Sequence, residues 1–150
     1  MKKAAVSACL TGERCRYDAT DNAMPDLLSR LKERGYEIVP FCPEDFAFGS
    51  PRPTMDLVAY PQGLRAISNR TGEDLSEPVM SYAKSFFDRH SDIALFVGKD
   101  RSPSCGVCTA KCYDQDKKLV SANATGLMAA EAKRRGVESV DAEAYLKRES

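Results

Sequence analysis

Short β-rich runs alternate with amphipathic segments of helical period along this chain, and this alternation restricts the possible folds more than any other feature. Strands are predicted at Lys3–Ala8, Tyr36–Phe41, Ile93–Val97 and Val137–Val140. Strand–helix–strand alternation is typical of α/β proteins with a largely parallel central sheet. The sequence therefore predicts one α/β domain over residues 1–150, with helices flanking the sheet in a Rossmann-like three-layer arrangement.

Turn and capping signals place the remaining elements. One helix is predicted over Met24–Arg34, and a second begins at Ser76 with an apolar stripe on one side. An Ala-rich helix is expected to be capped by Asn123, and a last helix follows Asp141. Between the first two helices, the segment Leu57–Ile67 is typical of a β-hairpin.

The balance of charge argues against several classes of partner. The 22 Lys and Arg residues equal the 22 Asp and Glu residues, whereas binders of nucleic acid or membrane surfaces usually carry a basic excess. The N-terminus begins like a signal peptide, but Cys9 interrupts its short apolar run, and no stretch approaches a membrane span. We therefore expect a cytoplasmic monomer or small homo-oligomer whose partner is neither a nucleic-acid polymer nor a membrane.

Three of the six cysteines occupy comparable places in this pattern. Cys9 follows the first predicted strand, Cys42 follows the second, and Cys105 lies in the loop after the third. Ligands of open α/β sheets bind outside the carboxyl ends of the strands, so these cysteines are predicted to converge at one crevice. In a reducing compartment, metal binding or catalysis explains such cysteines better than disulfides do.

Thiolates are soft ligands that suit zinc or an iron–sulfur cluster. Structural zinc usually closes its shell with four ligands, whereas a cluster held by three cysteines leaves one iron open for catalysis. The only histidine, His90, is expected at a helix end rather than at a metal. A second set, Cys105 with Cys108 and Cys112, has C-x-x-C-x-x-x-C spacing, and spacing alone does not decide between the two sets. Cys15 is expected to fill space.

Several motifs follow one another in the first two-thirds of the chain. In chain order they are Val6-Ser7-Ala8-Cys9-Leu10, Cys15-Arg16-Tyr17-Asp18, Cys42-Pro43-Glu44, Pro51-Arg52-Pro53, Gly72-Glu73-Asp74 and Lys99-Asp100-Arg101-Ser102-Pro103-Ser104-Cys105-Gly106. Together they closely resemble the thiouracil desulfidase (TudS-like) family. The pairing of C-P-E with S-P-S-C-G is highly specific. Where the family often has Gly-Gly-Leu after C-P-E, this chain has Asp45–Ser50.

The resemblance implies a [4Fe-4S] cluster bound by Cys9, Cys42 and Cys105 with one open iron, and it leaves Cys108 and Cys112 as extras. It also implies non-redox removal of sulfur from thiolated uracil compounds such as thiouracil, 4-thiouridine or its monophosphate. Water would attack the ring carbon while sulfur leaves onto the open iron as hydrosulfide. The alternatives are a zinc- or cluster-binding structural or redox module, and a cluster-dependent hydro-lyase.

Within these motifs, the predicted catalytic residues are Glu44, Ser102 and Lys99. Glu44 would deprotonate the water, unless it is only an acid at a helix start. Ser102 would hydrogen-bond the water, unless it only forms the turn around Pro103. Lys99 would stabilise a developing oxyanion, unless it is an ordinary solvated lysine of the loop. The predicted substrate-binding residues are Arg16, Tyr17, Arg52 and Ser104. The two arginines offer bidentate donors for a phosphate, although each could instead pair with a nearby acid.

Overall fold

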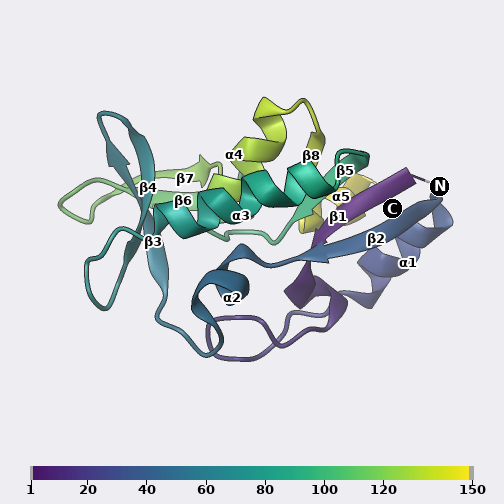
Figure 1. The fold of residues 1–150 in the computed structure, drawn as a ribbon, viewed down its shortest axis with the longest axis horizontal. Helices are drawn as coiled ribbons and strands as arrows, with labels where there is room; N and C mark the ends of the chain where they lie inside the picture. Colours follow the sequence, from purple (N-terminus) through teal and green to yellow (C-terminus); the bar gives the residue numbers. More distant parts are fainter. Residues whose placement is uncertain (1, 149–150) are drawn as a thin grey trace.

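Four parallel strands form the central sheet of the computed structural model, which describes residues 2–148. They are β1 (Lys2–Ser7), β2 (Tyr36–Phe41), β5 (Ile93–Gly98) and β8 (Glu138–Asp141), and their order across the sheet is β2-β1-β5-β8 (Figure 1). The three strands that precede the cysteines of interest are therefore direct neighbours. The predicted α/β class with a parallel sheet is confirmed.

Helices cover both faces of this sheet. Helices α1 (Pro25–Glu33) and α5 (Ala142–Arg148) pack on one face, and α3 (Ser76–Arg89) and α4 (Leu127–Arg134) on the other. Alternate residues of β1 enter the two cores: Val6 packs with the α1 face, and Ala5 with the α3 face. This period of two, with both faces buried, explains the continuous apolar run in the strand.

The apolar stripe of α3 lies in the core, as predicted. Val79, Ala83, Phe86 and Phe87 are all buried. The ring of Phe86 meets that of Phe41 edge-on at 5.7 Å between ring centres, and such aromatic packing stabilises the contact beyond its area. His90 follows the last turn of α3 with its ring 4.7 Å from that of Phe86, in keeping with its predicted place at a helix end.

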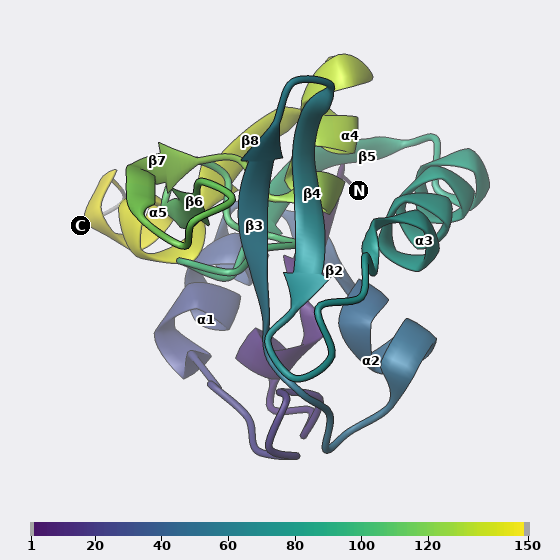
Figure 2. The same cartoon turned by 90° about the vertical axis from the view of Figure 1, so that its left-hand side faces the viewer.

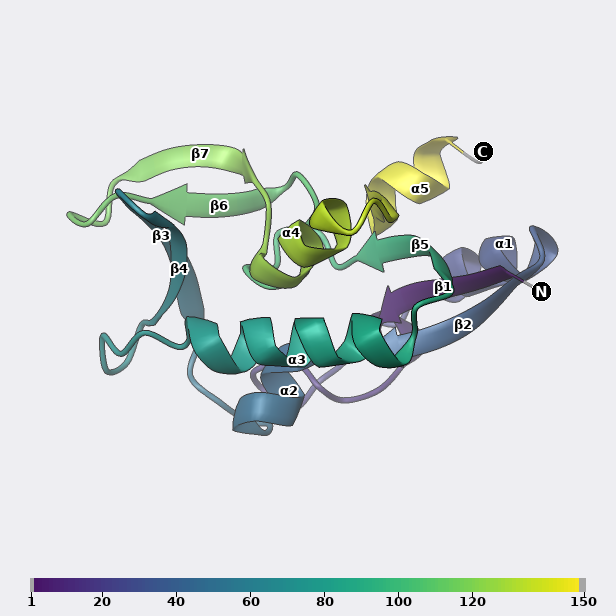
Figure 3. The same ribbon diagram turned by 45° about the horizontal axis from the view of Figure 1, so that its top comes forward.

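A second, mixed sheet projects from one end of the molecule (Figures 2 and 3). It contains β3 (Met55–Tyr60), β4 (Gly63–Ser68), β6 (Ala110–Tyr113) and β7 (Leu119–Ala124), in the order β4-β3-β6-β7. The β3–β4 hairpin was predicted, whereas no strand was predicted in the segment that forms β6 and β7. Strand β6 pairs in parallel with β3, a long-range contact that local pattern does not reveal.

The predicted cap at Asn123 is wrong. Asn123 lies in β7, and α4 begins only at Leu127 after Gly126. The first backbone N–H groups of α4 donate to the carbonyls of the preceding Cys105 loop, so this helix needs no side-chain cap.

Two short helices follow the strands β1 and β2. They are the 3₁₀ helix η1 (Ala8–Thr11) and α2 (Pro43–Phe48). Each carries or borders a cysteine at the carboxyl end of the central sheet. Within residues 2–148, no helix combines the length and apolar character that a membrane crossing requires.

Candidate functional site

A cavity of about 230 Å³ opens at the carboxyl ends of β1, β2 and β5. Cys9, Cys42 and Cys105 all line it, so their predicted convergence is confirmed. Cys9 and Cys105 are buried, and Cys42 is partly exposed. The sheet order explains the meeting, because adjacent parallel strands end at the same edge of the sheet.

The backbone around each of the first two cysteines is held in place. Cys9 lies in η1, whose chain turns away at Gly12 with a φ of 100°, a conformation that favours glycine. Cys42 directly precedes α2, and its backbone N–H donates to the hydroxyl of Tyr82 on α3 at 3.2 Å. Cys42 is thereby tied to the helix layer behind the cavity.

The Cys105 loop is anchored by hydrogen bonds on both sides. The hydroxyl of Ser102 accepts from the backbone N–H groups of Ser104 (3.2 Å) and Cys105 (3.0 Å). On the other side, the carbonyls of residues 103, 104 and 106 accept backbone N–H groups from residues 126–129 at the start of α4. Helix α4 and the loop therefore satisfy each other's polar groups.

Gly98, the last residue of β5, lies in close contact with this loop. A Cβ at Gly98 would stand 1.8 Å from the carbonyl oxygen of Cys105, which is backbone that cannot move aside cheaply. We expect Gly98→Ala to lower the free energy of unfolding by about 2 kcal/mol or more. The change in free energy is measured by urea unfolding, monitored by circular dichroism. Val120→Ala, at an exposed position of β7, is the control, and an unchanged midpoint for Gly98→Ala contradicts the close packing.

Cys15 is a fourth thiol at the cavity, and it is buried. Hydrogen bonding to Cys42 lowers the pKa of Cys15, but hydrogen bonding with Cys9 and burial together raise it to about 12. The hydrogen bond with Cys15, followed by burial, raises the pKa of Cys42. Burial is the main reason that the pKa of Cys105 is well above its usual value. The raised pKa values favour the protonated thiols, so a metal that bound them as thiolates would displace their protons.

Cys108 and Cys112 lie away from the cavity. Cys108 is exposed, and its thiol donates to the carboxylate of Asp141 at 3.4 Å. Cys112 is on β6 and is buried in the core of the second sheet. The three cysteines of the C-x-x-C-x-x-x-C set therefore lie in different places: at the cavity, on the surface and in the core of the second sheet. The fold does not gather them at one site.

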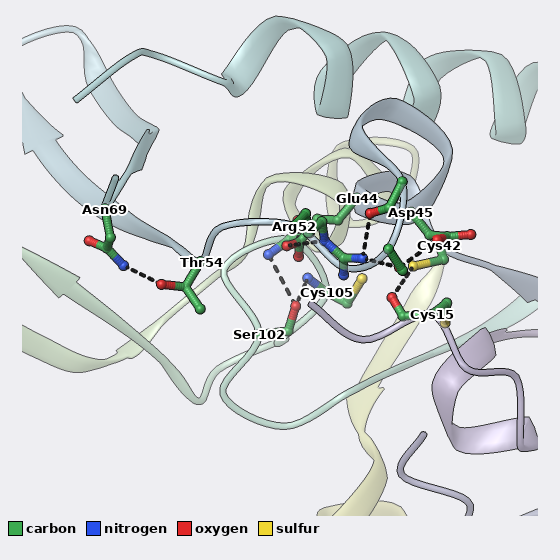
Figure 4. A network of polar contacts seen from close by, with 12 residues as sticks. Cys15, Cys42, Glu44, Asp45, Arg52, Thr54, Asn69, Ser102 and Cys105 are labelled. Carbon is green, nitrogen blue, oxygen red and sulfur yellow. Dashed lines mark hydrogen bonds and ion pairs between the residues drawn. The ribbon is translucent and has the colours of Figure 1, made fainter. Parts of the chain in front are cut away.

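A carboxylate at the cavity wall forms a small polar network (Figure 4). Glu44, in the first turn of α2, accepts a hydrogen bond from the hydroxyl of Ser104 at 2.9 Å. Its other oxygen lies 3.6 Å from Nε of Arg52, whose side chain is 6% exposed. That Nε is buried and has no hydrogen-bond partner among residues 2–148. Glu44 therefore starts a helix and also faces the cavity.

The other predicted residues fall at or near the same cavity. Ser102, Lys99, Arg16, Tyr17 and Arg52 line it, whereas Ser104 lies behind the wall with no exposed surface. Burial lowers the pKa of Lys99, whose Nζ donates to the carbonyl of Asp100 at 2.8 Å. At the rim, the Arg16 guanidinium lies 5.5 Å from the ring centre of Tyr17.

Outside the quoted motifs, three polar or soft side chains line the cavity and were missed from the sequence: Asn22, Thr54 and Met55. Asn22 lies in an irregular segment that carries no periodic signal. Thr54 and Met55 follow the P-R-P motif, and only that neighbourhood could have drawn attention to them. Thr54 accepts a hydrogen bond from the Asn69 amide at 2.9 Å (Figure 4).

The donor set suits an iron–sulfur cluster better than a single ion. Within the described residues, no group of three or more His, Cys, Asp or Glu side chains has the geometry to hold one metal ion. A cluster of four irons is larger than an ion, so its thiolate ligands stand further apart. Free buried thiols around one cavity, with no histidine among its lining residues, fit the soft iron of such a cluster.

The fold and the cavity define a class of α/β proteins that gather free thiols at the carboxyl ends of neighbouring parallel strands. Within this class, the chain belongs to the 2-thiouracil desulfurase family, whose sequence model matches residues 4–144. The resemblance drawn from the motifs is thereby confirmed.

Two known proteins are similar to this chain. The structure of TudS, a [4Fe-4S]-dependent thiouracil desulfidase, matches with a TM-score of 0.77 and 27% identity, and the match covers 98% of this chain and 95% of that one. Uncharacterized protein YbbK of Bacillus subtilis (strain 168) is 28% identical over 109 residues, covering 67% of this chain and 71% of its own.

Proposed function

We propose that this chain is a [4Fe-4S]-dependent desulfidase of thiolated uracil compounds. The observation that carries the proposal is the meeting of Cys9, Cys42 and Cys105 at one cavity with a carboxylate, Glu44, in its wall. The family and the similar TudS structure support the same activity. The proposed reaction replaces the ring sulfur with the oxygen of one water, releases hydrogen sulfide and transfers no net electrons.

The three cysteines would hold the cluster as thiolates. Bound in this way, the cluster supplies an open iron, a soft Lewis acid suited to a thiocarbonyl sulfur. The burial of Cys9 and Cys105 favours this role, because the surrounding chain limits the access of water and oxygen.

Glu44 is the proposed general base. It would take a proton from the water that attacks the ring carbon, which requires hydrogen-bond reach of the reacting atoms. The hydrogen bond from Ser104 and the neighbouring charge of Arg52 fix the direction of this carboxylate. Ser104 lies behind the cavity wall, so this contact favours a role through Glu44 over direct contact with substrate.

Ser102 and Lys99 are the proposed donors. The hydroxyl oxygen of Ser102 already accepts two backbone N–H groups, so its own hydrogen would be shared between the neighbouring Cys105 sulfur and the water or the ring. The ammonium of Lys99 uses one hydrogen on the carbonyl of Asp100 and keeps two for a uracil oxygen. An ammonium at a partly buried wall stabilises negative charge that develops on that oxygen.

Arg16 and Tyr17 are the proposed contacts for the outer part of the substrate. Their stacked side chains at the rim offer a flat surface and a cation to a ring or a phosphate. Arg52 differs, because its guanidinium is buried and donates to the carbonyl of Gly49 and the hydroxyl of Ser50. Those contacts favour a role in orienting Glu44 over the phosphate contact expected from the sequence.

Sulfide release from reconstituted protein tests the proposal. We expect the full chain, loaded with iron and sulfide under anaerobic conditions, to be brown and to convert a thiolated uracil to uracil with one sulfide per turnover. The substrate panel is 2-thiouracil, 4-thiouracil, 4-thiouridine and its monophosphate. A colourless protein that binds zinc in equal amount supports the structural module instead. A brown protein that releases no sulfide but dehydrates a hydroxy acid supports the hydro-lyase.

A further inference from the structure

Asp141 is a buried carboxylate that the motifs of the family resemblance do not include. It is the last residue of β8 and lies opposite Gly98, the last residue of β5, in the register of the two strands. Its exposed fraction is 1%. The side chain therefore stands at the point where the loop that carries Cys105 leaves the sheet.

Four donors from the far half of that loop converge on this carboxylate. Oδ1 accepts from the backbone N–H of Val107 at 2.7 Å and from the hydroxyl of Thr109 at 3.1 Å. Oδ2 accepts from the backbone N–H and the thiol of Cys108, at 2.9 and 3.4 Å. Hydrogen bonds to an ionised acceptor are stronger than neutral ones, and here they offset the burial of the charge.

The network also reaches the near half of the loop. The backbone N–H of Arg101 donates to the hydroxyl of Thr109 at 2.8 Å, and that hydroxyl donates to Asp141. The carboxylate thus ties positions before and after Cys105 to the end of β8. Ser102 holds the turn just before Cys105, so the cysteine lies between two fixed points.

We infer that Asp141 is a positioning residue, which holds the Cys105 loop in the conformation that binds the cluster before the cluster arrives. The inference rests on the proposed function in taking Cys105 as a ligand. Rigid support of a ligand lowers the cost of ordering it on binding and slows its release. Cys105 contributes the thiolate, and Asp141 acts on the cluster only through the loop.

Asp141→Asn tests this inference, because the amide is of equal size but turns one acceptor into a donor that faces the loop N–H groups. In the full-length apoprotein, we expect amide hydrogen exchange of residues 107 and 108 to rise about tenfold. Exchange in β1 and β5 should not change. After anaerobic reconstitution, the variant should lose its visible cluster absorbance to a chelator several-fold faster than the natural protein.

Two further variants separate positioning from general weakening. Thr109→Val removes the bridging hydroxyl and should accelerate cluster loss, whereas Thr109→Ser keeps it and should restore the natural rate. Asp74→Asn is the matched control, because Asp74 accepts from Ser76 and pairs with Arg65 far from the cavity. It should leave both readouts unchanged.

The outcomes distinguish this inference from the proposed function. The positioning role is overturned if Asp141→Asn has the same amide hydrogen exchange at residues 107 and 108 and the same rate of cluster loss as the wild-type protein. This holds even if the wild-type protein is an active desulfidase. If the natural protein takes up no cluster, the proposed function fails and the link to cluster binding fails with it. The exchange measurement needs no cluster, and it then decides whether Asp141 holds the loop.

Discussion

Cys42→Ser is expected to abolish cluster binding and sulfide release together. A hydroxyl is a hard, weakly acidic ligand, whereas iron in a cluster selects soft thiolates. With Cys9 and Cys105 alone, two irons rather than one would lack a protein ligand. Iron and sulfide analysis of the anaerobically reconstituted variant, with its visible spectrum, measures the loss. The same result is expected for serine at Cys9 or Cys105.

Cys108→Ser and Cys112→Ala are the matched controls, because each removes a thiol that does not line the cavity. Both variants should keep the brown colour and the activity, although Cys112→Ala loses some stability because its side chain is buried. If these two variants lose the cluster and Cys42→Ser keeps it, the ligands are instead the cysteines of the C-x-x-C-x-x-x-C set.

Glu44→Gln is expected to keep the cluster and to lower kcat by roughly 10²–10⁴-fold, the usual contribution of a general base. The amide retains an oxygen that can accept from Ser104, so the network in the cavity wall loses little geometry. It cannot take a proton from water. Steady-state sulfide release from protein of verified iron content measures the effect, and KM should change much less than kcat.

Asp45→Asn is the control for this substitution. Asp45 is the next residue in the first turn of α2, and it accepts from the hydroxyl of Ser50 at 2.6 Å without lining the cavity. Its loss removes the same charge from the same turn and should leave kcat near its natural value. Equal losses in the two variants would assign the effect to the helix charge and remove Glu44 from proton transfer.

Local pattern predicted the central sheet well. The strand predicted at Tyr36–Phe41 has the same first and last residues as β2. The helices after Met24 and from Ser76 also lie where capping and periodicity predicted them. The apolar residues of these segments recur with a strong period, because one face of each helix and both faces of the strands are buried against the cores. The positions of Cys9, Cys42 and Cys105 after predicted parallel strands were enough to predict that they converge, whereas their choice as ligands came from the motif resemblance.

The second sheet could not be predicted in the same way. Strand β6 is four residues long, and its partner β3 lies about fifty positions earlier, so the pairing has no local signature. Asn123 was misread for the same reason, because the strand β7 that contains it forms in place of a helix start. The network around Asp141 was invisible as well, because it joins a strand end to a loop more than thirty residues away.

The order of the cysteines along the chain has a consequence for biogenesis. Positions 9, 42 and 105 meet only after β1, β2 and β5 have assembled, and Cys105 follows β5 in the chain. A nascent chain emerging from the ribosome therefore has no complete site to load. If the proposed cluster binds there, it would be delivered to a folded recipient, whereas in zinc fingers metal binding itself drives the chain to fold.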